Sequence, residues 1–192
     1  SLVAGQPSSI SHTVYGNAYA VGPYAVYAAD MDNDGDIDLL SAHDGNNEIV
    51  WWEGDGANSN NWTKHSLTTT CYTARDVFAI DIDQDGDMDI LANSYSGPAA
   101  SQGIKLFLNN GTQSFSQGNN NNIITEHGNS SVYAVDMDND GDIDVLSSNF
   151  SSNRISWFEN NGAELSGGAT FSNSFTKYDI ATDASGAEEV YA

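Results

Sequence analysis

Basic residues are scarce in this sequence. Lysine and arginine together supply 5 of the 192 residues, against 27 aspartates and glutamates, and the formal net charge is −22 at pH 7. Nucleic acids and anionic membrane surfaces are bound through clusters of basic side chains, whereas the five here are scattered along the chain. We therefore expect no nucleic acid and no membrane surface among the partners.

Cysteine and long apolar runs are scarce as well. Cys71 is the single cysteine, so the chain cannot form an internal disulfide. No stretch approaches the ~18 consecutive apolar residues of a membrane-spanning helix. Hydrophobic residues nevertheless make up 39% of the chain and aromatic residues 10%, which is enough for a folded core. We expect one ordinary domain, or a piece of a larger protein, without membrane insertion.

The sequence also lacks the common signatures of catalysis. It contains no G-x-S-x-G, no H-E-x-x-H, no phosphate-binding loop and no dinucleotide fingerprint. His12 and His65 share a repeat position with Tyr178, and a tyrosine could not replace a catalytic imidazole. We therefore expect a protein that is not an enzyme.

What the chain does contain is a nine-residue motif, Asp-x-Asp-x-Asp-Gly-Asp-x-Asp, that occurs three times. It reads DMDNDGDID at 30–38, DIDQDGDMD at 81–89 and DMDNDGDID at 136–144. Two like charges ~4 Å apart repel each other by about 4 kcal/mol near a protein surface, so five clustered carboxylates need a counter-ion. Calcium takes about 6–8 oxygen ligands and suits acidic residues at positions 1, 3 and 5 followed by a glycine turn. The sequence predicts about three Ca²⁺ ions, one in each motif.

The expected ligands repeat from motif to motif. Positions 1, 3, 5 and 9 would offer side-chain carboxylates, and position 7 its backbone carbonyl. The candidate metal-ligating residues are Asp30, Asp32, Asp34, Asp36, Asp38, Asp81, Asp83, Asp85, Asp87, Asp89, Asp136, Asp138, Asp140, Asp142 and Asp144.

The flanking residues distinguish these loops from an EF-hand. An EF-hand loop ends on a bidentate glutamate at position 12, where this chain has Ser41, Ala92 and Ser147. Short runs rich in β-branched and aromatic residues stand on either side of each motif, and such runs are typical of strands. Each motif should therefore connect two strands rather than two helices.

Each motif belongs to a longer repeat with four expected strands. The motifs start 51 and then 55 residues apart, and a repeat of this length without helical periodicity is typical of a β-propeller blade. An aromatic strand in each repeat runs into Asp-Gly or Asn-Gly, a strong hairpin signal, and packing between blades should bury at least one face of it. The expected strands are 26–29, 37–42, 49–53 and 62–67; 77–80, 88–93, 104–108 and 115–124; and 132–135, 143–148, 155–159 and 175–180.

These units resemble FG-GAP/VCBS-type repeats, the calcium-binding blades of integrin α-subunit propellers and of many secreted bacterial proteins. The resemblance is carried by DxDxDGDxD, by the DLL, DIL and DVL strands that follow, and by the WWEGDG, LFLNNG and WFENNG hairpins. The second unit departs from it at Leu106 and Leu108, and at a polar insertion, 119–122, that we expect to bulge from the surface. The resemblance implies a binding function, with calcium holding the scaffold.

The expected fold is all-β: a β-propeller-type segment of about three four-stranded antiparallel blades with a calcium loop in each. Because a closed propeller uses about 4–8 blades, we also expect either head-to-tail self-association or continuation in a longer chain. Within one repeat domain over 1–192, we assign 1–22 to the last strand of a preceding blade, 23–70, 71–128 and 129–182 to three blades, and 183–192 to the first strand of a next blade.

The expected role is that of an extracellular or cell-surface module. Calcium sites that bind at about 10⁻⁴–10⁻³ M suit the calcium concentration outside cells. Adhesion, or binding of a protein or glycan ligand, is the function that the resemblance implies. A structural subunit of an extracellular assembly or filament, an accessory propeller of a secreted polysaccharide-degrading enzyme, and a spacer remain open as alternatives.

Overall fold

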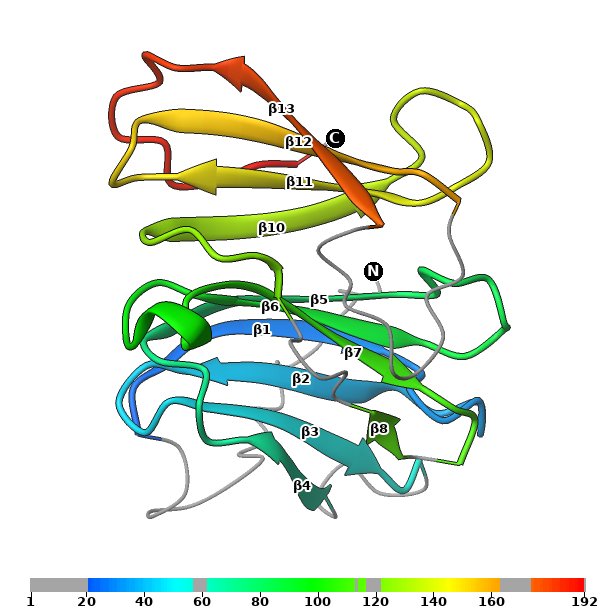
Figure 1. Ribbon diagram of the computed structural model, residues 1–192. Helices are drawn as coiled ribbons and strands as arrows, with labels where there is room; N and C mark the ends of the chain where they lie inside the picture. The colour runs from blue at the N-terminus through cyan, green and yellow to red at the C-terminus, as the bar shows by residue number, and fades with distance from the viewer. Residues whose placement is uncertain (1–20, 57–61, 113, 117–121, 163–173, 192) are drawn as a thin grey trace, which may run out of the picture.

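The computed structural model describes residues 21–56, 62–112, 114–116, 122–162 and 174–191. Within these residues the chain forms three antiparallel sheets that are stacked in sequence order (Figure 1). The first sheet contains β1 (Pro23–Ala29), β2 (Asp38–His43), β3 (Glu48–Gly54) and β4 (Trp62–Thr68), paired in that order. In the part of the chain that is described, no helix is long and apolar enough to cross a membrane.

The second and third sheets repeat the arrangement of the first. The second contains β5 (Ala74–Ile80), β6 (Asp89–Ser94), β7 (Gly103–Asn109), β8 (Phe115–Ser116) and β9 (Asn122–Ile124), with a short 3₁₀ turn, η1 (Ala99–Ser101), before β7. The third contains β10 (Asn129–Val135), β11 (Asp144–Asn149), β12 (Arg154–Asn160) and β13 (Phe175–Ala181). The expected all-β fold of three four-stranded, blade-like sheets is confirmed.

The strand register places each aspartate motif in the same turn of its sheet. The last residue pair before the turn is Ala29 with Asp38 in the first sheet and Ile80 with Asp89 in the second. Val135 and Asp144 form the same pair in the third. Positions 1 to 8 of every motif therefore lie in the connection between the first two strands, and position 9 opens the second strand.

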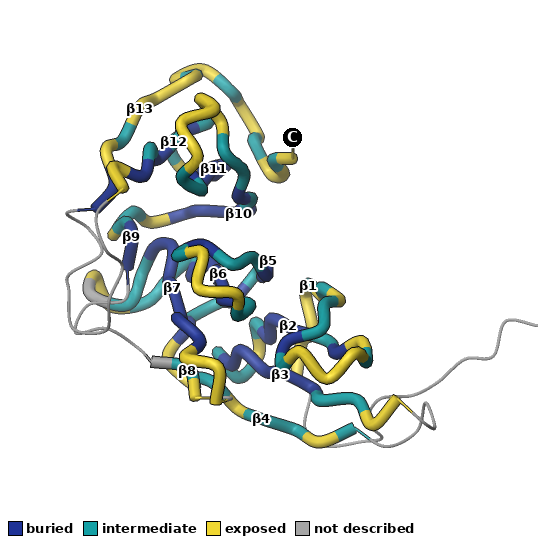
Figure 2. Tube along the Cα trace, turned by 90° about the vertical axis from the view of Figure 1, so that its right-hand side faces the viewer, coloured by how far each residue is buried: buried dark blue, intermediate teal, exposed yellow. Residues whose placement is uncertain are grey.

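The core lies between the sheets. One buried cluster joins the first sheet to the second through side chains such as Leu40, Trp51 and Phe107. The other joins the second sheet to the third through side chains such as Leu106 and Phe158. Figure 2 shows this burial along the facing strands. At least one face of each aromatic strand is buried between blades as expected, because neighbouring side chains of a strand point to opposite faces of its sheet.

The second blade has a divided outer strand. Where the sequence predicts one strand over 115–124, the structure has β8 and β9, and both pair with β7. Residues 119–121 of the expected bulge lie outside the described residues, but Asn122 does not bulge outward: it is buried in β9, and its amide donates to the Gln102 carbonyl oxygen at 2.9 Å. Its side-chain amide thus bonds to the backbone just before β7 instead of pointing into solvent.

The expected end strands have different outcomes. Most of 1–22 lies outside the described residues, so that assignment stays a prediction. Residues 183–191 contain no strand, although the sequence predicts one over 183–192. Their backbone groups are used in local turns and in a contact with the third blade: Ala184 N–H donates to the Asn153 carbonyl and Ala187 N–H to the Ala184 carbonyl.

Candidate metal centre

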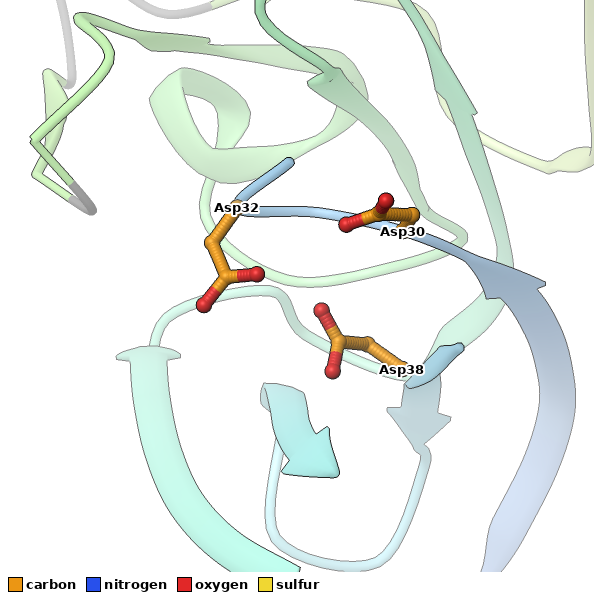
Figure 3. Close-up of side chains that lie close together, drawn as sticks. All are labelled: Asp30, Asp32 and Asp38. Atoms are coloured by element: carbon orange, nitrogen blue, oxygen red, sulfur yellow. The ribbon is translucent and has the colours of Figure 1, made fainter. Parts of the chain in front are cut away.

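Each aspartate loop brings carboxylates together. Oxygens of Asp30, Asp32 and Asp38 lie within 4.8 Å of one another, and Figure 3 shows these three side chains turned toward a common space. Asp30 directly follows β1 and Asp38 opens β2, so the hairpin itself gathers them. The corresponding groups in the other two blades are Asp81, Asp83 and Asp85, and Asp136, Asp138 and Asp144.

The loop backbone is folded around the first and fifth positions. Asp30 accepts the backbone N–H of Asp34 at 3.2 Å and that of Gly35 at 3.0 Å, one on each carboxylate oxygen. Asp34 in turn accepts the N–H of Asp36 at 2.8 Å. The same three bonds form in the second loop, at 3.0 Å each, and in the third, at 3.2, 3.2 and 2.9 Å. These bonds hold the carboxylates in place while leaving lone pairs for a cation.

Glycine at position 6 serves the backbone conformation of this turn. Gly35, Gly86 and Gly141 have φ angles of 93°, 98° and 101°, which side chains rarely tolerate. A Cβ atom at any of the three would meet nothing within 4 Å. The requirement for glycine is therefore conformational and does not come from crowding.

The aspartate at position 9 connects the loop to the end of the third strand of its own blade. Asp89 is fully buried, and its oxygens accept the N–H of Ile82 at 3.0 Å and of Asn109 at 2.7 Å. Asp38 and Asp144 make the same pair of bonds. Burial raises the pKa of Asp89 to about 7, although the two N–H donors oppose that rise. A cation beside the carboxylate would favour its charged form.

The aspartate at position 7 faces the turn that follows the third strand of its blade. A Cβ atom on Gly111 would lie 2.6 Å from Oδ2 of Asp87, and one on Gly162 would lie 2.7 Å from Oδ2 of Asp142. Asp87 and Asp142 thus lie outside the groups of three described above, and their side chains pack against the turn. This is compatible with the expectation that position 7 would use its carbonyl.

The pKa values within the loops reflect crowding of acidic groups. Burial is the largest cause that raises the pKa of Asp32, followed by the charges of Asp34 and Asp38. Burial and the charge of Asp85 raise the pKa of Asp83 in the same way. Both causes penalise a carboxylate that lacks a nearby positive charge. The three loops are therefore places where a cation relieves an electrostatic cost.

The donor set fits calcium. All candidate ligands are oxygens, which hard cations prefer. Two oxygens that both lie about 2.3–2.6 Å from one calcium ion are at most about 5 Å apart, and the carboxylate oxygens here lie within 4.8 Å of one another. The groups of three include position 9 in the first and third loops but position 5 in the second. Calcium bound there would neutralise the clustered charge and hold together the first two strands of the blade.

Two kinds of residue around the loops were missed by sequence reasoning. The residue at position 4 has a left-handed backbone in every loop, with φ of 61° at Asn33, 59° at Gln84 and 63° at Asn139, and two of these amides reach the loop of the next blade. Asn109, at the end of β7, donates to the Met31 and Met88 carbonyls at 3.2 and 3.3 Å. The recurrence of a side-chain amide at position 4 was the signal that could have revealed the first kind.

Comparison with known proteins supports this description. Two consecutive copies of the FG-GAP-like repeat match residues 30–92 and 95–147. No curated protein matches the chain. Among solved structures, the chain is similar to the crystal structure of BBS1N in complex with ARL6DN, soaked with lead, with 15% sequence identity and a TM-score of 0.44. That similarity covers 80% of this chain and 47% of the other, so the chain spans about half of that chain's length. Because the two repeats account for more than half of its residues, the chain belongs to the FG-GAP-like repeat family.

Proposed function

We propose that the chain is a calcium-stabilised binding module that acts outside the cell or at its surface and is not an enzyme. The observation that carries this proposal is the threefold recurrence of one oxygen-lined loop with one hydrogen-bond pattern. Calcium holds the blades in shape, and the blades present a surface to a protein or glycan ligand. The acidic balance of the chain favours partners other than nucleic acids and anionic membranes.

The structural role of calcium follows from the position of the loops. Each loop joins the first two strands of a blade, and its position 9 also contacts the end of the third strand. A cation that fixes the loop therefore fixes three of the four strands. A carboxylate that acts as a general acid or as a nucleophile must be free to transfer a proton or to form a new bond. A metal-bound carboxylate is poorly suited to either role.

Calorimetric titration of metal-stripped protein tests the calcium part of the proposal. We expect about three sites for Ca²⁺ and weaker binding of Zn²⁺, which prefers nitrogen and sulfur ligands. The variant Asp85→Ala removes the position-5 carboxylate of the second loop and should lose about one site. Absence of calcium uptake, or a clear preference for zinc, would contradict the assignment.

A glycan or protein ligand is tested separately from calcium. The described surface offers an aromatic pair suited to stacking on a sugar ring: Trp157 stacks on Tyr178 with ring centroids 5.0 Å apart, and Tyr178 is 45% exposed. Binding to a glycan array should fall on removal of calcium and in Tyr178→Ala. A signal that survives both changes would show that this surface is not the binding site.

A second candidate function is that of a structural subunit in an extracellular assembly. Side chains at positions 2 and 8 of the loops face neighbouring blades, and Met31 and Met88 both contribute to the cluster between the first two sheets. The equivalent residues that none of the described neighbouring sheets covers are Met137 in the third blade and Ile37 in the first, and they are 44% and 59% exposed. Two copies stacked head to tail would bring such a pair together, because the two faces differ and cannot form a twofold contact.

Sedimentation of this chain in calcium distinguishes the two candidates. Head-to-tail stacking predicts mass that grows with concentration and is lost in Met137→Glu, which places a charge in the contact. A monomer at every concentration would reject the structural subunit and leave the binding module.

A further inference from the structure

In the first and second loops, the side chain at position 4 points away from its own loop and toward the next blade. The Asn33 amide donates to the Gly86 carbonyl at 3.3 Å and to Oδ1 of Asp87 at 3.1 Å, both in the second loop. The Gln84 amide donates to the Gly141 carbonyl in the third loop. The same repeat position therefore makes the same contact across two successive pairs of blades.

The conformation of its own loop sets the direction of this amide. Position 4 lies between two candidate ligand positions and has a left-handed backbone in every loop. The N–H of the next residue, Asp34, donates to the carboxylates of Asp30 and Asp32 at 3.2 and 3.3 Å. A cation that gathers positions 1, 3 and 5 would thus also fix where Asn33 points.

The accepting peptide orients carboxylates of the next loop. Asn33 holds the carbonyl of Gly86, and the N–H of the following residue, Asp87, donates to Asp85 at 3.0 Å. The N–H of Gly86 itself donates to Asp81 at 3.0 Å. One amide from the first blade therefore steadies the peptide group that holds position 5 of the second loop, next to the peptide group that holds position 1.

A second contact joins the first two loops from their buried side. The Asn109 side chain donates to the Met31 carbonyl in the first loop and to the Met88 carbonyl in the second. This amide and that of Asn33 connect the two loops in opposite directions. The loops are thus parts of one hydrogen-bonded row rather than three separate turns.

We propose that the calcium loops are coupled through the amides at position 4, so that calcium binding is positively cooperative along the row of blades. Asn33 and Gln84 are positioning residues for the second and third loops, and the inference rests on the proposed calcium-binding function. A loop ordered by its own ion presents its amide to the next loop, which then has less ordering left to accomplish. The coupling is reciprocal, because linkage requires each ion to affect the other equally.

The chain provides a matched control for this proposal. The first and third loops have the same nine residues, so Asn33→Ala and Asn139→Ala make the same local change. In the part of the chain that the structure describes, the Asn139 amide donates to no other loop. Any cost of alanine in the left-handed conformation is common to both variants, and the difference between them reports the bond between blades.

Calorimetric titration of the metal-stripped full chain with calcium tests the coupling. We expect a Hill coefficient above one for the unchanged protein. Asn33→Ala and Gln84→Ala should lower the mean calcium affinity by roughly 2- to 10-fold, the value of one hydrogen bond, and should move the Hill coefficient toward one. Asn139→Ala should leave the Hill coefficient unchanged. Asn33→Gln keeps a donor amide, as found naturally in the second loop, and should retain cooperativity.

The outcomes separate the two proposals. Equal losses in Asn33→Ala and Asn139→Ala would overturn the coupling, because the amide would then act only on its own loop. Three independent sites in the unchanged protein would overturn it too, while leaving the calcium-binding function intact. No calcium uptake at all would overturn the proposed function and the coupling with it.

Discussion

The first and third aspartate loops have identical sequences but different surroundings. Their local geometry is nearly the same: position 5 donates its N–H to position 1 at 3.2 Å in both, and position 7 donates to position 5 at 2.8 and 2.9 Å. In both loops the carboxylate at position 9 also accepts a backbone N–H from the last residue of the third strand, at 2.8 Å. The nine residues thus determine the shape of the loop wherever it stands in the chain.

The neighbouring blades determine the rest. Met31, at position 2 of the first loop, is 1% exposed because the second sheet covers it, whereas Met137 of the third loop is 44% exposed. Position 8 shows the reverse: Ile37 is 59% exposed, and Ile143 packs against the second sheet. Equal sequences should therefore bind calcium through the same atoms but contribute unequally to stability.

Removal of calcium should have the largest effect, because it acts on what the loops share. Binding to the folded state alone stabilises it by about 2.7 kcal/mol per site at a hundredfold excess over Kd, and removal also restores repulsion among the carboxylates. We expect EDTA to lower the melting temperature strongly. Differential scanning calorimetry with and without EDTA measures this, and an unchanged melting curve would mean that the loops do not hold a stabilising ion.

The methionines at position 2 should separate the two loops. Met31→Ala removes a fully buried side chain and should destabilise the fold by about 2–5 kcal/mol. Met137→Ala changes a side chain that is largely in water and should cost about 0.5 kcal/mol or less. Urea unfolding of both variants in calcium gives the two free energies. Similar losses would show that both faces are covered in solution.

The same difference shows which parts of the structure could be predicted from the sequence. The motif and its flanking runs predicted the strands, because alternation and turn residues act locally, and Ala29 pairs with Asp38 as the loop position requires. The contact from Asn33 to Gly86 spans 53 residues. The recurring amide marks position 4 in the sequence, but no local pattern identifies its partner, since the contact depends on how one blade packs on the next.

The divided outer strand of the second blade escaped prediction for a related reason. Phe115 and Ile124 both belong to strands, and the aromatic and β-branched residues there predicted this much. The buried Asn122 amide donates to the carbonyl of Gln102, the residue before β7. Polar composition alone therefore suggested a bulge where tertiary hydrogen bonding buries the side chain.

The hairpin glycines offer a smaller test of the same comparison. Gly56 and Gly162 both have positive φ, 57° and 65°, so alanine at either should cost about 1–2 kcal/mol for its backbone conformation. A Cβ on Gly56 would lie only 1.8 Å from the Asp36 carboxylate, against 2.7 Å between Gly162 and Asp142. Gly56→Ala should therefore destabilise more than Gly162→Ala in urea unfolding. Equal costs would mean that the position-7 carboxylate moves away freely.

The smallest expected effect concerns one residue near the end of the second strand, where the first blade has His43 and the third has Asn149. His43 is fully buried, its Nε2 lies 2.7 Å from the Ser41 hydroxyl, and that hydroxyl accepts the indole N–H of Trp52 at 2.7 Å. Ser41 is thus free to donate its own hydrogen to a neutral imidazole. Burial, aided by the charge of Lys64 and opposed by Glu48, lowers the pKa of His43.

A histidine whose folded pKa is lowered stabilises the protein above its unfolded pKa of about 6.5, and that contribution is lost as the pH falls below this value. His43→Asn places the residue of the third blade in the first and removes the titration. Between about pH 7 and about pH 5, the free energy of unfolding in saturating calcium should therefore fall more for the unchanged protein than for His43→Asn. The aspartate loops are the same in both proteins, so their titration cancels in the difference. Parallel pH profiles would show that the imidazole is protonated equally in the folded and unfolded states, and that this position distinguishes the two blades by shape alone.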